Sequence, residues 1–208
     1  RRTAAAGLMG LSAILIASTA PDYPDDGPPA LWPWRGGETL IEYHLAQLAE
    51  AGVRDIVVVL GFDAERIIPL VARDNIEPIV DPRWSNGPAS SLRAGASAVP
   101  RGAGTAIIVY INEPRPDAIF TALLDAHFDG GAAITRPSWE GSPGAPIIVG
   151  EAVLAEMRNL ADDARGIEAV CDRHAAQIAD VPFESSVVRR SLSTLADWEN
   201  MQDYDLSS

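Results

Sequence analysis

The segment that most constrains how this chain can fold runs from Thr105 to Pro116. Within it, residues 106–111 form an unbroken apolar run rich in β-branched residues, which is typical of a strand covered on both faces in the middle of a parallel sheet. Asn112 and Glu113 follow directly, and the two prolines after them cannot continue a ladder. We therefore expect both polar side chains at the carboxyl end of a central strand, where open α/β sheets bind ligands.

The composition excludes several classes of protein. With 208 residues, 47% of them hydrophobic, the chain is long and apolar enough for one domain with its own core. Its net charge of −13 repels phosphate backbones and anionic lipid, so we expect neither nucleic acid nor a membrane as the main partner. No apolar stretch has the length of a membrane span, and we expect a cytoplasmic protein. The sequence contains no lysine, so no side chain supplies a primary amine.

The cysteine and the histidines form no recognisable catalytic or metal motif. Cys171 is the only cysteine, which excludes an internal disulfide and a cysteine-rich zinc site. We favour a partly buried helix residue over a nucleophile, because no histidine motif accompanies it. His44, His127 and His174 fall on separate predicted helices without the i, i+4 spacing of a metal pair, which predicts structural or surface roles.

The first twenty residues allow two interpretations. Two arginines followed by small and apolar residues resemble a short secretory signal with a small-residue cleavage site. Alternatively, residues 12–17 are the first buried strand, preceded by an N-terminal extension at residues 1–11. We favour the strand, because the helix that follows needs it to pack against.

Strands and helices are predicted to alternate along the whole chain. We expect strands at residues 12–17, 56–60, 76–80, 106–111, 132–135, 146–149, 178–181 and 187–192, with Pro78 marking an edge strand. We expect helices at residues 39–51, 63–72, 117–128, 152–160 and 166–174, and one that Ser90 or Ser91 caps. A capping box, Thr39-x-x-Glu42, opens the first of them, and Asp63 caps the second. The pattern predicts a single domain, residues 1–208, with a three-layer α/β fold and a mixed, mostly parallel sheet.

Three spaced segments are similar to those of one family, the MobA-like nucleotidyltransferases, which include molybdenum-cofactor cytidylyl- and guanylyltransferases. They are, in chain order, LWPWRGGETLIEYHLAQLAEAGVRDIVVVLG, DPRWSNGPASSLRAG and RPSWEGSPGAPIIVG. The resemblance implies a nucleotide-binding fold of the glycosyltransferase-A, Rossmann-like type. It also implies Mg²⁺-dependent transfer of a nucleotidyl group from CTP or GTP to a small phosphorylated acceptor such as molybdopterin.

The resemblance also assigns candidate site residues. The nucleotide side is implied at Gly87, Ser90, Ser91 and Arg93, catalysis at Asn112 and Glu113, metal binding at Asn112, Glu113 and Glu199, and the acceptor side at Gly144 and Pro146.

The departures from the family pattern lie where the chemistry takes place. The family's glycine-rich phosphate loop is replaced by residues 18–37, which carry five prolines and the acids Asp22, Asp25 and Asp26. Prolines have no amide hydrogen to offer a phosphate, and the family's lysine is missing. Asn112 stands where the family has a metal-binding aspartate, and a neutral amide attracts a hard cation less than a carboxylate does. We therefore expect catalysis to be weakened or lost.

Three hypotheses follow from these residues. In an active enzyme, Glu113 and Glu199 hold Mg²⁺ and Arg35 or Arg93 replaces the lysine, unless these acids are ordinary solvated residues. A non-catalytic nucleotide-binding or assembly module keeps only the base pocket, unless its serines merely cap a helix.

The third hypothesis concerns the proline-rich loop at residues 21–34. Trp32 and Trp34 either form a contact surface for a protein partner or close the core under the first helix.

Overall fold

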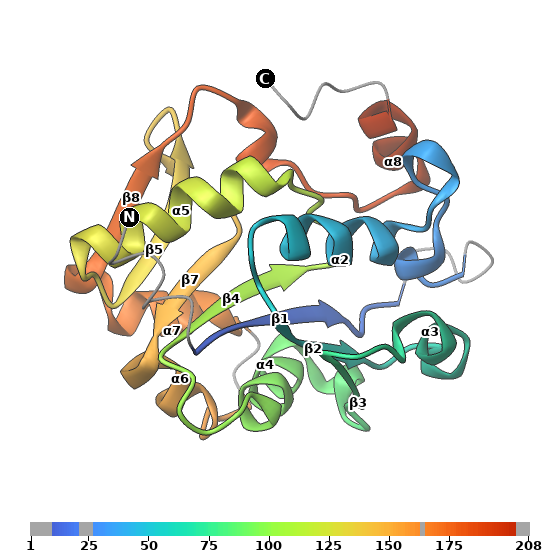
Figure 1. The fold of residues 1–208 in the computed structure, drawn as a ribbon, viewed down its shortest axis with the longest axis horizontal. Helices are drawn as coiled ribbons and strands as arrows, with labels where there is room; N and C mark the ends of the chain where they lie inside the picture. The colour runs from blue at the N-terminus through green and yellow to red at the C-terminus, as the bar shows by residue number, and fades with distance from the viewer. Residues whose placement is uncertain (1–9, 21–26, 163–164, 203–208) are drawn as a thin grey trace.

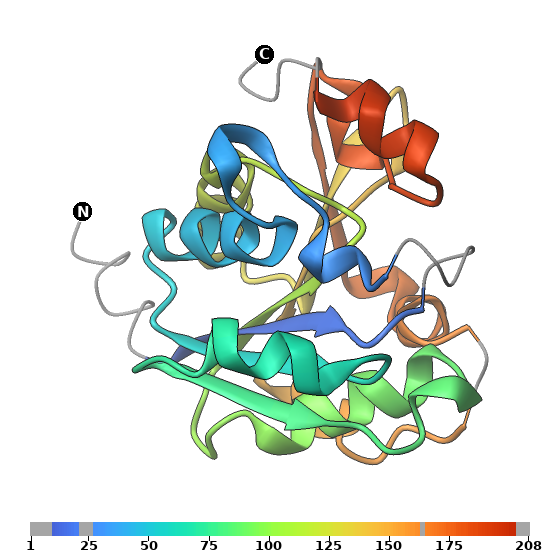
Figure 2. The ribbon, with the colours of Figure 1, turned by 90° about the vertical axis from the view of Figure 1, so that its right-hand side faces the viewer.

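The computed structural model describes residues 10–20, 27–162 and 165–202. Helices cover both faces of one eight-stranded sheet in the order β3-β2-β1-β4-β7-β5-β6, with β8 also paired to β5 (Figures 1 and 2). The strands are β1 (Leu11–Ala17), β2 (Asp55–Leu60), β3 (Ile76–Val80), β4 (Thr105–Tyr110), β5 (Ile134–Trp139), β6 (Ser142–Pro143), β7 (Ile147–Gly150) and β8 (Ile178–Pro182). The helices are α2 (Leu40–Glu50), α3 (Ala64–Val71), α4 (Pro88–Ala98), α5 (Asp117–Gly130), α6 (Glu151–Met157), α7 (Ile167–Arg173) and α8 (Leu195–Gln202). The predicted fold class is confirmed.

Strand β1 lies at the middle of the parallel half of the sheet. All seven of its residues are buried, and it pairs in parallel with both β2 and β4. Its side chains alternate between two cores, because successive residues of a strand point to opposite faces. Leu15 packs with α2, α3 and α5, whereas Ile14 packs with α4, α6 and α7. The interpretation of residues 12–17 as a buried strand is therefore confirmed.

The central strand β4 joins two kinds of sheet. It runs parallel to β1 but antiparallel to β7, so its expected place in the middle of a parallel sheet is wrong on one side, whereas the predicted mixed sheet is confirmed. The predicted end of the strand at residue 135 is also wrong, because β5 continues through Trp139 and pairs with β8 along residues 134–138. Positive φ angles of 49° at Glu140 and 74° at Gly141 then turn the chain into β6.

Helix ends follow the sequence signals in one case and depart from them in two. Thr39 and Glu42 form the predicted capping box at the start of α2. The predicted caps of α4 are wrong: Gly87 occupies the N-cap position and Pro88 opens the helix, which leaves Ser90 and Ser91 buried inside its first turns. Asp63 precedes α3 with φ 56°, and its side chain makes no cap hydrogen bond.

The segments flanking the sheet bring further corrections. Residues 186–189 form a 3₁₀ helix rather than the predicted strand at 187–192, and the tail forms α8. Trp32 and Trp34 are only 5% and 4% exposed, so these two side chains close the core beside α2. Of the predicted extension at residues 1–11, residues 1–9 lie outside the described residues and Leu11 already begins β1. The acids Asp22, Asp25 and Asp26 also lie outside the described residues.

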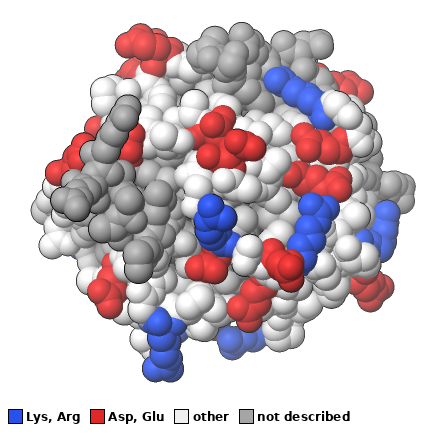
Figure 3. Space-filling model, viewed as in Figure 1, with Lys and Arg blue, Asp and Glu red and all other residues white. Residues whose placement is uncertain are grey.

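Acidic and arginine side chains are interspersed on the face of the molecule shown in Figure 3. Among the described residues, no helix is long and apolar enough to cross a bilayer.

Candidate functional site

Two adjoining pockets open at the carboxyl ends of β1 and β4. The first, which we call the uncharged pocket, has a volume of about 330 Å³ and is lined by Ile16, residues 18–20 after β1, residues 84–85 and 87–88, Ser91 of α4, and Tyr110. The second, which we call the charged pocket, has a volume of about 480 Å³ and includes Glu113, Arg136, Arg165, Glu168, Asp172 and Arg189 in its lining. Tyr110, the last residue of β4, lines both.

A buried carboxylate organises the wall of the uncharged pocket. Asp81 is 2% exposed and accepts hydrogen bonds from the hydroxyls of Ser90 and Ser91, both at 3.0 Å, and from the backbone N–H of Arg83 at 2.9 Å. The hydroxyl of Ser91 also lies 2.8 Å from that of Ser18 at the end of β1. These bonds tie α4 to two strands, since a buried polar group is stable only when it is satisfied.

Of the predicted nucleotide-side residues, Gly87 and Ser91 line the uncharged pocket, whereas Ser90 bonds to Asp81 and Arg93 lies elsewhere. The guanidinium of Arg93 donates to the backbone oxygen of Leu160 and lies 2.9 Å from the carboxylate of Asp162. The structure therefore brings together only part of this group.

The predicted metal ligands point to different surroundings. The side-chain amide of Asn112 donates to the hydroxyl of Ser191 at 2.7 Å. Glu113 lines the charged pocket, and Glu199 is exposed on α8. Within residues 10–20, 27–162 and 165–202, no three His, Cys, Asp or Glu side chains gather as a metal site. This donor set does not fit a hard divalent cation, which binds several oxygen ligands at once.

Glu113 is held in an unusual state. The residue is partly exposed, but its Oε2 atom is buried and has no hydrogen-bond partner among the described residues. Burial raises the pKa of this carboxyl above its ordinary value, and the nearby positive charge of Arg115 acts in the opposite direction.

Arg115 joins the segments that form the other side of the charged pocket. It is 1% exposed and donates to the backbone oxygens of Pro114, Ala145, Val188 and Arg190 at 2.8–3.2 Å. Burial lowers its pKa to about 10, which still leaves it charged at neutral pH. The charge is thus satisfied by four carbonyl dipoles from three segments of the chain, at residues 114, 145 and 188–190.

The predicted acceptor-side residues lie in or next to the segments that Arg115 holds together. Gly144 lines the charged pocket, and a Cβ atom there would lie 2.2 Å from the backbone oxygen of Val188. No other residue fits at that position without displacing the chain. Pro146 is buried after a cis peptide bond.

The paired arginines and the cysteine complete the charged pocket. Arg136 lies 2.6 Å from Asp180, and Arg165 lies 2.5 Å from Asp172. Cys171 is 6% exposed on α7, and burial raises the pKa of its thiol, so its interpretation as a buried helix residue is confirmed.

Sequence reasoning missed Tyr110, Arg115, Arg136 and Arg189. Of these, only Arg115 could have been found from the sequence, because the prolines on both sides of it restrict the backbone conformations open to this segment after the central strand.

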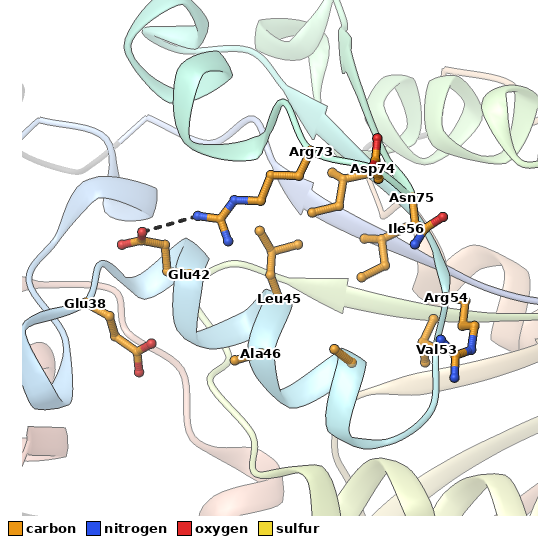
Figure 4. Close-up of a pocket in the computed structure, with 12 residues that line it drawn as sticks. Glu38, Glu42, Leu45, Ala46, Val53, Arg54, Ile56, Arg73, Asp74 and Asn75 are labelled. Carbon is orange, nitrogen blue, oxygen red and sulfur yellow. Dashed lines mark hydrogen bonds and ion pairs between the residues drawn. The ribbon is translucent and has the colours of Figure 1, made fainter.

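A third pocket, of about 450 Å³, lies between α2 and the amino ends of β2 and β3 (Figure 4). The ion pair of Glu42 and Arg73, 3.5 Å apart, spans part of it. This pocket lies at the opposite edge of the sheet from Tyr110, so we exclude it from the site.

Solved structures of other proteins share this mixed α/β fold. A nucleotidyl transferase from Methanothermobacter thermautotroptrophicus superposes with a TM-score of 0.76 at 17% identity, over 93% of this chain and 96% of that one. Rv0371c from Mycobacterium tuberculosis H37Rv superposes with a TM-score of 0.76 at 18% identity, over 94% and 99% of the two chains, and has also been solved in complex with manganese.

The sequence comparisons assign the family. The MobA-like NTP transferase domain matches residues 26–197, and the chain belongs to this family. Nicotine blue oxidoreductase from Paenarthrobacter nicotinovorans is 36% identical over 91 residues, which are 42% of this chain and 43% of that protein. The bifunctional protein GlmU from Mycolicibacterium paratuberculosis is 31% identical over 135 residues, 61% of this chain and 27% of that protein. The chain thus spans less than half the length of these curated relatives.

Proposed function

We propose that this protein binds the base and sugar of a nucleoside triphosphate, CTP or GTP, in the uncharged pocket, and that its Mg²⁺-dependent nucleotidyl transfer is weakened or lost. The observation that carries the proposal is the absence of any charged side chain from that pocket among the described residues. Attack on an α-phosphate accumulates negative charge, which a cation, a metal ion or backbone amides must stabilise.

The groups that line the uncharged pocket suit a nucleoside better than a triphosphate. Ser18, Ser85 and Ser91 offer hydroxyls, and Trp84 and Tyr110 offer aromatic surface. Burial raises the pKa of the Tyr110 phenol, so this group stays a neutral hydrogen-bond donor. Such groups recognise a base or a sugar through hydrogen bonds and stacking.

The metal end of the site supports the same proposal. Asp197 lies two residues before the predicted metal ligand Glu199, and its Oδ2 accepts hydrogen bonds from the backbone N–H groups of Ser193 and Thr194 at 3.0 and 2.9 Å. This carboxylate therefore stabilises the start of α8. Glu113 and Glu199 belong to no group of three His, Cys, Asp or Glu side chains that could hold a metal among the described residues.

An active enzyme that uses Glu113 and Glu199 is the second candidate, because a protein of the same fold has been solved with manganese. Divalent metal use by this chain is a proposal under that candidate. The two candidates differ in how Mg²⁺ affects nucleotide affinity.

Isothermal titration with CTP, GTP, ATP and UTP, each with Mg²⁺ and with EDTA, separates them. We expect weak binding of CTP or GTP with the same Kd under both conditions. Ser85→Glu introduces a negative charge at the pocket and should weaken binding about tenfold or more, which is 1.4 kcal/mol. Thr121→Glu, which adds the same charge on the exposed side of α5, is the control. Tighter binding with Mg²⁺ that Glu113→Gln abolishes, together with nucleotidyl transfer, would establish the active enzyme instead.

A further inference from the structure

The charged pocket contains a carboxylate that the protein itself leaves unsatisfied. The Oε2 atom of Glu113 is buried with no hydrogen-bond partner among the described residues, and the residue lines the pocket. Buried polar atoms in proteins are nearly always hydrogen-bonded, and each exception needs an explanation. A ligand that brings a hydroxyl or an amino group to this carboxylate supplies the missing donor.

One of the three arginines in the charged pocket has no carboxylate partner among the described residues. Arg136 and Arg165 are neutralised by their ion pairs with Asp180 and Asp172. Arg189 is exposed and lines the pocket. Its side chain makes no ion pair or hydrogen bond with a described residue. It is therefore available to a negatively charged group.

The balance of charge limits the ligand to one negative group. Besides Glu113, the exposed carboxylate of Glu168 faces the pocket and has no ion pair among the described residues. With three arginines and three acids in its lining, the pocket has no excess of positive charge for a polyanion such as a triphosphate, whereas the guanidinium of Arg189 can pair with one negative group.

The lining of the charged pocket also contains apolar side chains. Ile108 of β4 and Ile147 of β7 line it on the side of the sheet, and Val188 lines it next to Arg189. Arg115 and the close contact at Gly144 fix the positions of these segments, so the pocket is formed before a ligand enters.

We propose that the charged pocket binds a small monoanionic compound that bears hydroxyl or amino groups on an apolar frame, with its anion at Arg189 and a donor at Glu113. That this compound is the acceptor of a nucleotidyl group rests on the function proposed above. The binding itself does not, and it is tested without nucleotide and in EDTA.

Shikimate is a suitable probe, because it carries one carboxylate and three hydroxyls on a six-membered ring. Its methyl ester lacks the negative charge, and 1-cyclohexenecarboxylate lacks the hydroxyls. We expect shikimate to bind in the millimolar range, as a ligand of this size does, and each analogue to bind about tenfold more weakly or not measurably.

Variants locate the probe in the pocket. Arg189→Glu should abolish shikimate binding, Arg189→Lys should retain most of it, and Glu113→Gln should weaken it about tenfold, the scale of one charged hydrogen bond. Arg101→Glu makes the same charge change on an exposed turn outside the pocket and should leave the Kd unchanged.

Cys171 provides a reporter of occupancy, because it is the only thiol in the chain and lines this pocket. Shikimate should slow the alkylation of Cys171 by iodoacetamide in the unmodified protein and in Ser85→Glu, but not in Arg189→Glu. The proposal is overturned if shikimate does not bind in the millimolar range, if its methyl ester binds equally well, or if Arg189→Glu leaves the Kd unchanged. None of these outcomes bears on nucleotide binding in the uncharged pocket, which Ser85→Glu tests separately.

Discussion

The two pockets at the carboxyl edge of the sheet share Tyr110, but one is lined by uncharged side chains and the other by several charged ones. The uncharged pocket has hydroxyls, aromatic surface and glycine in its described lining, and the carboxylate of Asp81 behind its wall is buried and satisfied by three donors. The charged pocket has three arginines and three acids in its lining, and one of those acids, Glu113, lacks a hydrogen bond to a described residue.

This difference shows where the molecule keeps its potential to bind charge. A nucleotidyltransferase needs cations at the triphosphate, yet the described arginines of the site surround the neighbouring pocket. Within the described residues, the pocket proposed to bind the nucleotide offers neutral contacts, whereas the second pocket offers charged groups that a ligand can engage.

The largest effect on stability is expected from removing the hydrogen bonds with which Arg115 holds the segments of the charged pocket together. Arg115→Met removes the donor to four carbonyls, and we expect a loss of roughly 3–5 kcal/mol in the free energy of unfolding, the scale for losing one partner of a buried charged network. Urea unfolding at pH 7 measures it. Shikimate binding should disappear in the folded variant, whereas CTP or GTP binding should persist.

Arg101→Met is the matched control for this change, because Arg101 is exposed and surface substitutions usually alter stability by less than about 0.5 kcal/mol. A loss below about 1 kcal/mol in Arg115→Met would mean that water satisfies the four carbonyls. The two pockets would then differ in charge but not in rigidity.

A smaller loss is expected from the uncharged pocket. Ser91→Ala removes one hydrogen bond to the buried carboxylate of Asp81 and the contact with Ser18, which should cost roughly 1–3 kcal/mol. Ser97→Ala is the control on the same helix, since the Ser97 hydroxyl is exposed and donates only to the backbone oxygen of Arg93. Equal losses in the two variants would show that the Asp81 network does not hold the pocket together.

How far the sequence predicts this molecule depends on the range of the interactions. Local signals placed the capping box at Thr39 and the buried strands, because strand and cap patterns depend on a few neighbouring residues. They misplaced the start of α4, since the serines that resemble caps are held by Asp81, nine and ten residues away.

The site was predicted less well for the same reason. The position of Glu113 at the end of β4 followed from the strand alone. The burial of its Oε2 without a hydrogen-bond partner among the described residues depends on tertiary packing, which no local sequence pattern encodes. Arg136 and Arg189 likewise reach one pocket only because β5 and the 3₁₀ helix at residues 186–189 meet β4 in space.

The smallest predicted effect has the opposite sign. Glu113→Gln replaces an unsatisfied buried carboxylate with a neutral amide, and we expect the variant to be more stable by roughly 1 kcal/mol at pH 8. The folded protein raises the pKa of Glu113 above 4.5, so it holds this proton more tightly than the unfolded chain does. Wild-type stability attributable to this group is therefore present at low pH and lost as the pH rises through the raised pKa. The stability gain from Glu113→Gln should shrink toward pH 5.

Glu168→Gln, which changes an exposed carboxylate of the same pocket, should show no such gain at either pH. If Glu113→Gln were instead destabilising at pH 8, the carboxylate would have a partner in solution. If Glu113→Gln is more stable but binds shikimate more weakly, the carboxylate of Glu113 serves ligand binding and lowers the stability of the fold. The carboxylate of Asp81 differs, because its three hydrogen bonds satisfy it within the protein.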